Sequence, residues 1–377
     1  MDASSAHLMK PYGWNLPVAI KFGVGMADHA AQALHGRRVV VLAYAGATRH
    51  EHVARLSRTL CDSLIDWLEV PEGLSTMALG RTVASKVWPA LARDRQSVLL
   101  GLGGGSVMDV AKWLRLRPED GDPKGLDLLL ASSAQPVGWT RHELWLLPTT
   151  AGTGSEVTRW STLWDTDTMP ASKRSFDQAY AYADHAVVDP LLSLTCPQPV
   201  VLHSALDAFG HCLEVLWNRH RNPTSVMLAV QAAQAIVRAL PQALREPHDL
   251  GHRTNLSHAA LQAGMAFSQT RTAIAHALSY PLTLDQGVAH GAAVAVWLPL
   301  AWRMAMGRST DVDASLQGVW GLPPQAGLQR MHDWFKDIGF GLDLEQLGVT
   351  DVRERVQAAL SHERGRNFEG DWVDGQG

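Results

Sequence analysis

The chain has 377 residues, of which 46% are hydrophobic and 19% are charged, and its formal net charge is −4. This length predicts two globular domains, and the small net charge gives no sign of a nucleic-acid partner. The sequence contains no secretory signal, no apolar run long enough to span a membrane and no CxxC pair, so we expect a cytoplasmic protein without a membrane partner.

The first half of the sequence alternates strand-like and helix-like segments. Residues 38–44 are a short β-branched run that predicts a buried strand, and a helix is expected at about 49–66. A second strand within 97–106 runs into glycines and is followed by a predicted helix at 106–116. A third strand leads into a Gly/Thr-rich loop within 142–156. This order predicts βαβ units and a parallel sheet.

The character of the sequence changes near residue 190, where Pro190, Pro197 and Pro199 interrupt the chain. From about residue 200 onward, helical periodicity dominates and we find no clear strand. The sequence therefore predicts an α/β dinucleotide-binding domain over 1–190 and an all-helical domain over 191–377, whose polar, glycine-rich tail from Ser361 is expected to be partly disordered. Helices are predicted at 200–217, 223–245, 255–277 and 291–306.

Two loops that follow predicted strands have the composition of phosphate-binding loops. GLGGGSVMD (101–109) places glycines at the start of a helix, where free N–H groups bind negative charge and where we expect Ser106 and Asp109 to form a capping box. It approximates the dinucleotide fingerprint with serine for the last glycine, and a tight structural turn is the alternative. PTTAGTGSE (148–156) adds hydroxyl groups after the next strand. Together the loops predict a nucleotide site at the carboxyl edge of the sheet.

The predicted helix at 200–217 carries Asp207 and His211 four residues apart, so both lie on one face. A hydrogen bond on the helix surface would explain such a pair by itself. His276 and His290 follow in similar surroundings of alanine and glycine, which leave room for an ion. One carboxylate and three imidazoles suit iron(II) or zinc(II), and a position left for a further ligand fits catalysis.

Six motifs resemble the iron-containing (group III) alcohol dehydrogenase family, whose architecture is related to that of dehydroquinate synthase. In chain order they are GGGSVMDVAK, LPTTAGTGSEVTR, VVDPLLSLT, ALDAFGHCLE, IAHALSYPL and VAHGAAVAVWLP. The resemblance implies a domain that binds NAD(H) or NADP(H) and a helical domain that binds a divalent metal, with iron(II) favoured over zinc(II). By motif position it implies Asp207, His211, His276 and His290 as metal ligands and catalytic residues, and coenzyme contacts from Gly104, Gly105, Ser106, Asp109, Thr149, Thr150, Thr153 and Lys173.

Two positions depart from the family pattern. Many members have a second histidine four residues after the ligand at 276, whereas this chain has Tyr280, which is a poorer base at neutral pH. Many also have an aspartate after the first strand, where it can hold the adenosine ribose, whereas this chain has Tyr44 and its neighbours. Loss of that carboxylate removes repulsion against a 2′-phosphate, so the sequence is compatible with both NAD(H) and NADP(H).

Within the family, LEVLWNRHRNPTSVMLA and AFSQTRTAIAHALSYPLTLDQGVAHG resemble the phosphonate-metabolism branch, the phosphonoacetaldehyde reductases. A phosphonate needs an arginine or several N–H donors. Arg271 and Tyr280 are the expected substrate contacts, although a residue five positions before His276 turns away from its face of a helix. Arg219 and Arg221 are expected to be solvated or paired with acids.

These features predict a metal-dependent NAD(P)H alcohol dehydrogenase or aldehyde reductase that reduces phosphonoacetaldehyde to 2-hydroxyethylphosphonate as a homodimer. An enzyme for uncharged short-chain alcohols or aldehydes is the nearest alternative. A lyase of the dehydroquinate-synthase kind would need several lysines and arginines around a polyanionic substrate, whereas the site region is rich in Ala, Leu and Trp. Retention of all four candidate ligands disfavours a non-catalytic binding protein.

Overall fold

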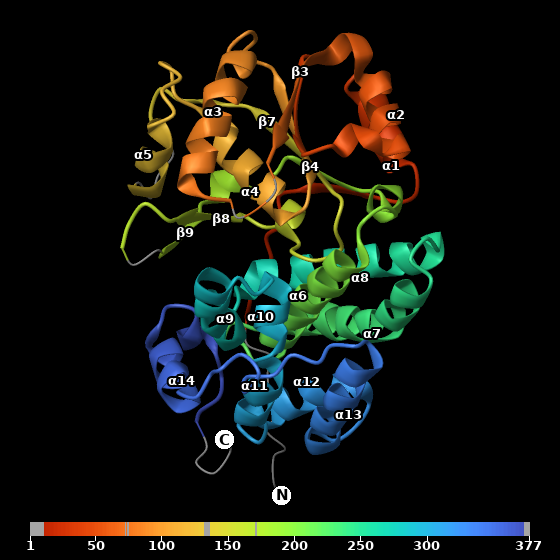
Figure 1. Ribbon diagram of the computed structural model, residues 1–377, viewed down its shortest axis with the longest axis vertical. Helices are drawn as coiled ribbons and strands as arrows, with labels where there is room; N and C mark the ends of the chain where they lie inside the picture. Colours follow the sequence, from red (N-terminus) through yellow and green to blue (C-terminus); the bar gives the residue numbers. More distant parts are fainter. Residues whose placement is uncertain (1–10, 72, 74, 132–135, 170–171, 373–377) are drawn as a thin grey trace, which may run out of the picture.

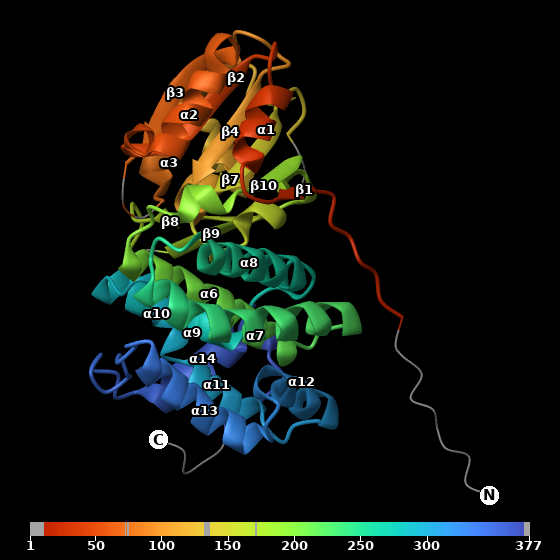
Figure 2. The same cartoon turned by 90° about the vertical axis from the view of Figure 1, so that its right-hand side faces the viewer.

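The computed structural model describes residues 11–71, 73, 75–131, 136–169 and 172–372. A sheet with helices on both faces lies above a group of helices that contains the second half of the chain (Figures 1 and 2). This arrangement confirms the predicted fold class, an α/β layer followed by an all-helical region. The predicted division at residue 190 falls between the last strand of the sheet and the first long helix below it, and stays a prediction.

The sheet has six parallel strands in the order β1-β10-β7-β4-β2-β3. Successive residues of β2 point to opposite faces, so Val39 and Val41 pack into one hydrophobic cluster while Val40 and Leu42 pack into another. Burial on both faces explains the near-continuous apolar runs of the central strands. The strands are β1 (Ala19–Phe22), β2 (Val39–Tyr44), β3 (Leu64–Val70), β4 (Val98–Gly103), β7 (Glu143–Pro148) and β10 (His185–Val188).

Helices α1 and α2 cover one face of the sheet, and α3 and α4 cover the other, with α5 beside them (Figure 1). Two antiparallel hairpins, β5–β6 and β8–β9, lie outside the main sheet. The β8–β9 hairpin lies between the sheet and the helical region (Figure 2). The bounds are α1 (Met26–Ala33), α2 (Glu51–Leu60), α3 (Met77–Leu91), α4 (Gly105–Leu114), α5 (Gly125–Ala131), β5 (Leu116–Arg117), β6 (Thr140–Arg141), β8 (Trp160–Asp165) and β9 (Ser172–Asp177).

The helical region is built around α6, whose second half is buried on all sides. Helices α7, α8 and α10 pack directly against it. No helix in the described residues is long and apolar enough to cross a membrane. The bounds are α6 (Gln198–Leu216), α7 (Pro223–Arg245), α8 (Leu250–Thr270), α9 (Ile274–Gln286), α10 (His290–Ala295), α11 (Leu298–Ala305), α12 (Thr310–Trp320), α13 (Pro324–Asp337) and α14 (Val352–Ser361).

Three predicted helices differ from the observed ones. The segment 49–66 ends as a helix at Leu60, and its last residues begin β3, which pairs with β2. The segment 255–277 is two helices, because the chain turns at Arg271, whose φ is 67°. The segment 291–306 is also two helices, with Pro299 in the first turn of the second, where its missing N–H costs no hydrogen bond.

The predicted capping box at the start of α4 does not form. The helix begins at Gly105 with Gly104 as its N-cap, and no side chain caps it. Asp109 instead accepts hydrogen bonds from Ser155 Oγ at 2.7 Å and from the Thr162 N–H at 2.8 Å. It therefore ties α4 to the second Gly/Thr loop and to β8, so that the two predicted loops lie side by side.

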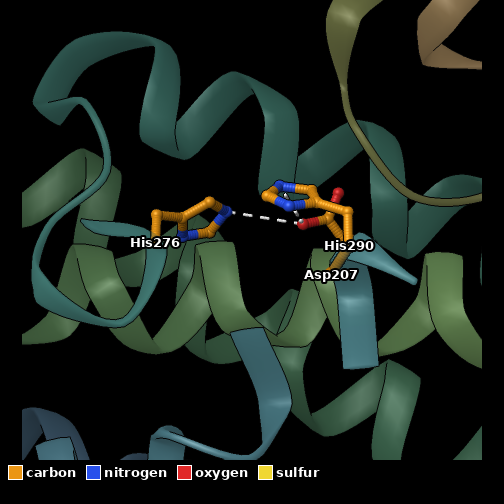
Figure 3. Close-up of side chains that lie close together, drawn as sticks. All are labelled: Asp207, His276 and His290. Atoms are coloured by element: carbon orange, nitrogen blue, oxygen red, sulfur yellow. Dashed lines mark ion pairs between the residues drawn. The ribbon is translucent and has the colours of Figure 1, made fainter. Parts of the chain in front are cut away.

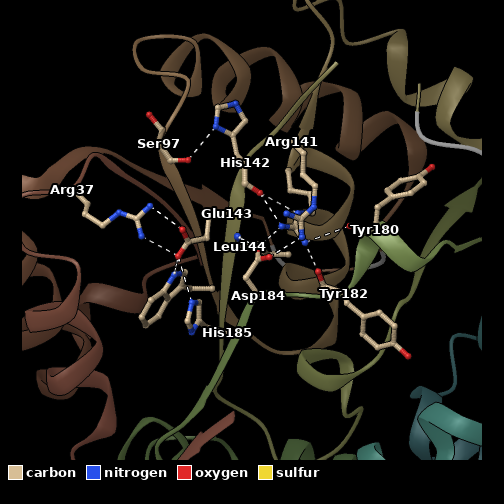
Figure 4. Close-up of polar contacts among 12 residues, drawn as sticks. Arg37, Ser97, Arg141, His142, Glu143, Leu144, Tyr180, Tyr182, Asp184 and His185 are labelled. Carbon is tan, nitrogen blue, oxygen red and sulfur yellow. Dashed lines mark hydrogen bonds and ion pairs between the residues drawn. The ribbon is translucent and has the colours of Figure 1, made fainter. Parts of the chain in front are cut away.

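A polar network lies at the amino ends of β7 and β10, at the edge of the sheet opposite the two Gly/Thr-rich loops (Figure 4). Arg115 donates to the carbonyl oxygens of His142 and Tyr182 and pairs with Asp184. His142 is fully buried, and its Nδ1 lies 3.1 Å from the carbonyl oxygen of Ser97. Burial lowers the pKa of His142 to about 4, so this imidazole is neutral at neutral pH.

Candidate metal and coenzyme site

Helix α6 places Asp207 and His211 on the face that is directed at the sheet layer. Both side chains are almost fully buried, and His211 Nε2 lies 3.9 Å from Asp207 Oδ1. One turn of helix separates the two residues, so the spacing seen in the sequence does bring them together. The ring of His211 stacks on Phe267 of α8, with 4.0 Å between ring centroids, and this contact fixes its plane.

Two further helices bring the remaining imidazoles to Asp207. His276 Nε2, from α9, lies 3.4 Å from Asp207 Oδ1, and His290 Nε2, from the first residue of α10, lies 3.7 Å from it. Figure 3 shows these three side chains directed at one another. One ligand atom from each lies within 4.8 Å of the others. His211 adjoins the three, because its ring stacks on that of His276 with 4.6 Å between centroids.

Glu214 determines the orientation and the tautomer of the His276 imidazole. This fully buried carboxylate accepts hydrogen bonds from the backbone N–H groups of Ala273 and His276, and it lies 2.8 Å from His276 Nδ1. A carboxylate partner keeps the proton on Nδ1, so the Nε2 lone pair faces Asp207. Glu214 stands inside the quoted motif ALDAFGHCLE, but sequence reasoning assigned it no role. The feature of the sequence that could have identified Glu214 is its position seven residues after Asp207, which places it near the same helix face.

The residues present fit a divalent cation. Asp207 Oδ1 and His276 Nε2 are buried, and neither has a hydrogen-bond partner in the described part of the chain. Burial opposes ionisation of Asp207, but the three imidazoles hold its pKa well below the usual range. Burial also lowers the pKa of His211 to about 4 and of His290 to about 3, whereas Glu214 and Asp207 outweigh burial and raise the pKa of His276, so a bound cation would displace a proton from this imidazole. An ionised carboxylate and neutral imidazoles are the forms that bind iron(II) or zinc(II).

A cavity of about 270 Å³ connects this cluster to the glycine loop. Its wall on the sheet side includes Gly105, Ser106 and Thr153, and its wall on the helical side includes the four candidate ligands. The backbone at Gly105 approaches Thr153 closely, since a Cβ there would lie 2.8 Å from Thr153 Cγ2. A coenzyme lying along this cavity would have its phosphates at the start of α4 and its other end near the imidazoles.

Other residues predicted to contact the coenzyme lie around the same loops. Thr150 packs beside Gly104, and Thr149 is buried, with its N–H donating to the Gly103 carbonyl. Asp109 lines the cavity, but both its carboxylate oxygens accept hydrogen bonds from within the protein. Lys173, on β9, also lines the cavity.

The structure does not bring Arg271 into the cavity. Its guanidinium pairs with Asp177 and with Glu363, because the turn after α8 directs it at β9 and the C-terminal segment. Tyr280 lines a second cavity, and the Lys173 ammonium lies over its ring, 4.2 Å from the ring centroid. As expected, Arg221 pairs with an acid, Glu369, whereas Arg219 donates to the Phe368 carbonyl.

The C-terminal segment supplies a cavity residue that sequence reasoning missed. The segment from Ser361 to Trp372 is described and packs on the helical region, and the remainder of the tail, for which partial disorder was expected, lies outside the described residues. Asn367 and Phe368 are buried, and Arg364 reaches the cavity beside Lys173. The last of the six family motifs ends at residue 299, so no motif pointed to this segment.

Sequence profiles of one family match both halves of the chain. The profile described as iron-containing alcohol dehydrogenase matches residues 17–190, and that of the C-terminal region of the Fe-containing alcohol dehydrogenase family matches residues 201–369. The chain belongs to the iron-containing alcohol dehydrogenase family. Membership confirms the predicted resemblance and, at the level of the family, the prediction of an oxidoreductase.

Individual relatives differ in their named substrates. Long-chain-alcohol dehydrogenase 1 of Geobacillus thermodenitrificans is 36% identical over 66% of this chain and 58% of its own length. Phosphonoacetaldehyde reductase of Streptomyces viridochromogenes is 33% identical over 55% of this chain and 54% of its own. The chain thus spans less than two thirds of either protein. Sulfoacetaldehyde reductase of Bifidobacterium kashiwanohense, solved with NAD+, has the same fold, with a TM-score of 0.85, 24% identity and coverage of 97% and 96%.

Proposed function

We propose that this protein is a metal-dependent NAD(P)H aldehyde reductase whose substrate is phosphonoacetaldehyde and whose product is 2-hydroxyethylphosphonate. The observation that carries the reductase assignment is the convergence of Asp207, His211, His276 and His290 at one end of a cavity whose other end is the glycine loop. A metal and a coenzyme bound in these places would meet in one cavity.

When bound, the proposed metal would supply Lewis acidity, and the proposed coenzyme would supply the hydride. The chain contributes position and environment. Glu214 holds the Nδ1 proton of His276, and Phe267 holds the ring plane of His211. Trp160, which stacks on Phe267, and Trp164 form apolar walls that exclude water. No described side chain is assigned as the proton donor, so we infer that the proton comes from solvent.

The proposal covers coenzymes with and without a 2′-phosphate on the adenosine ribose. Tyr44 ends β2, and burial raises the pKa of its hydroxyl to about 12, so it carries no negative charge. A neutral residue there permits either NADH or NADPH. The metal is proposed as iron(II), with zinc(II) as the alternative, because the ligand set suits both.

Support for the phosphonate substrate comes from the quoted motifs and from the relative named phosphonoacetaldehyde reductase. An enzyme for uncharged aldehydes is the second candidate, favoured by the Geobacillus relative. A lyase of the dehydroquinate-synthase kind would consume no coenzyme. The predicted homodimer and cytoplasmic location remain proposals, which light scattering and cell fractionation would check.

The function is tested by following NADH and NADPH oxidation with phosphonoacetaldehyde and with propanal. We expect metal-dependent oxidation that is faster with phosphonoacetaldehyde. A preference for propanal would support an aldehyde reductase but contradict the assignment of a phosphonate substrate. Turnover without coenzyme oxidation would favour the lyase. His276→Ala should lose bound metal and at least about 100-fold in activity, as expected when a ligand is removed. His248→Ala, an exposed site, is the matched control.

A further inference from the structure

Two cationic side chains, Lys173 and Arg364, form part of the cavity wall close to the candidate metal ligands. They come from parts of the chain far apart in sequence, β9 and the C-terminal segment, and both line the second cavity of about 480 Å³ as well. The Lys173 ammonium lies over the faces of Tyr280 and Trp164, at 4.2 and 5.5 Å from their centroids. Ring faces hold a cation in place without cancelling its charge.

Arg364 is fixed beside the segment that carries His276. Its Nη1 donates to Thr272 Oγ1 at 2.6 Å, and its Nη2 donates to Ser175 Oγ at 3.4 Å. Thr272 precedes His276 by four residues and lines the same cavity. The guanidinium is thus held by neutral hydroxyls on one side, with donors left to face a ligand.

Neither cation forms an ion pair with a carboxylate in the described residues. Neighbouring cations on the same surface behave differently: Arg271 pairs with Asp177 and Glu363, and Arg174 pairs with Asp165. Burial and the nearby Arg364 lower the pKa of Lys173 to about 7. Asp109, Asp207 and Glu214 oppose this decrease from a distance, and a bound anion would favour the charged ammonium in the same way.

We propose that Lys173 and Arg364 form an anion subsite that binds the tetrahedral head group of the substrate, a phosphonate or sulfonate. This inference rests on the proposed reductase function and deepens it by naming the substrate class, a short aldehyde with an oxyanion one or two carbons from the carbonyl. Thr272, which anchors Arg364, lines the same cavity as His276, so the head group and the aldehyde of one molecule would share this cavity. The coenzyme phosphates are assigned to the glycine loop, and the subsite replaces the coenzyme contact that the resemblance implied for Lys173 with a contact to the substrate.

The subsite is tested first by substrate preference. In Arg364→Met, the ratio of kcat/KM for sulfoacetaldehyde or phosphonoacetaldehyde to kcat/KM for propanal should fall about 10- to 100-fold, the loss of a charged hydrogen-bonded contact. Arg366→Met, an exposed arginine in the same segment, should leave the ratio unchanged. An unchanged ratio in Arg364→Met would overturn the proposal, as would a loss confined to the coenzyme KM.

A second measurement separates this inference from the proposed function, because it needs no turnover. Methylphosphonate and ethanesulfonate should raise the melting temperature of the metal-loaded wild type and of Arg366→Met, but not of Arg364→Met or Lys173→Met. Equal stabilisation of all four proteins would contradict the proposed anion subsite. If the stabilisation follows this pattern but no aldehyde is reduced, the subsite stands and the reductase assignment fails.

Discussion

Glu214 has no access to solvent, yet it controls both the orientation of a candidate ligand and the start of the helix that carries it. Its carboxylate accepts hydrogen bonds from two backbone N–H groups at the start of α9, those of Ala273 and His276, and from Nδ1 of His276. One side chain therefore caps a helix and fixes a tautomer, so the turn after α8 and the candidate metal site depend on each other.

Replacement of Glu214 by glutamine keeps its shape and removes its charge. We expect Glu214→Gln to weaken metal binding about 10- to 100-fold, as is usual for a partner of a ligating histidine. Competition with a chelator would measure the dissociation constant. Glu354→Gln, at an exposed site on α14, is the control. Unchanged metal affinity in Glu214→Gln would show that His276 is oriented by packing alone.

At the scale of elements, the contact between α6 and α10 sets the distance between Asp207 and His290. Gly291 lies where the two helices meet: a Cβ at this position would be 1.8 Å from the carbonyl oxygen of His203 and 3.2 Å from Asp207 Cβ. Since backbone cannot give way as a flexible side chain does, the two helices can approach this closely only with glycine at 291.

Gly291→Ala should therefore push α10 away from α6 and carry His290 with it, although every ligand is retained. We expect a loss of about 100-fold in kcat/KM, the order expected for a displacement of about 1 Å. Gly341→Ala, where a Cβ meets nothing within 4 Å, should have no effect. Metal content and activity equal to the wild type in Gly291→Ala would mean that the helices tolerate the methyl group.

Sequence patterns predicted the elements whose signals are local. The apolar runs of β2, β4 and β7 and the helical spacing of Asp207 and His211 are visible within a few residues. The half-buried edge strand β3 gives no such run, and its pairing depends on β2. The break between α8 and α9 depends on Glu214, and the position of Arg364 depends on how the C-terminal segment packs. Each is decided by residues distant in the sequence.

At the scale of the whole molecule, the buried His142 makes the free energy of unfolding depend on pH. Its pKa is about 4 in the folded protein and near 6.5 when unfolded. The folded pKa is the lower one, so between these values the unfolded chain binds the additional proton. Stability contributed by the neutral imidazole is therefore present above about pH 6.5 and is lost as the pH falls towards 4.

His142→Gln can keep a hydrogen bond to the Ser97 carbonyl but cannot titrate. Between about pH 7 and about pH 5, the wild type should lose about 2 kcal/mol more of its unfolding free energy than this variant does. Urea denaturation at the two pH values would measure the difference. His248→Gln, at an exposed site, should follow the wild type. Parallel losses in wild type and His142→Gln would show that protonation of His142 is not the cause.

The position of Arg364 has a consequence for how the protein is made. The ribosome adds this arginine long after all four candidate ligands, and the residues that seat it come from β9 and from the turn before α9. A polypeptide cut short just before it would retain the glycine loop and the complete set of imidazoles. Such a product could still take up metal and coenzyme while having lost its means of choosing among aldehydes.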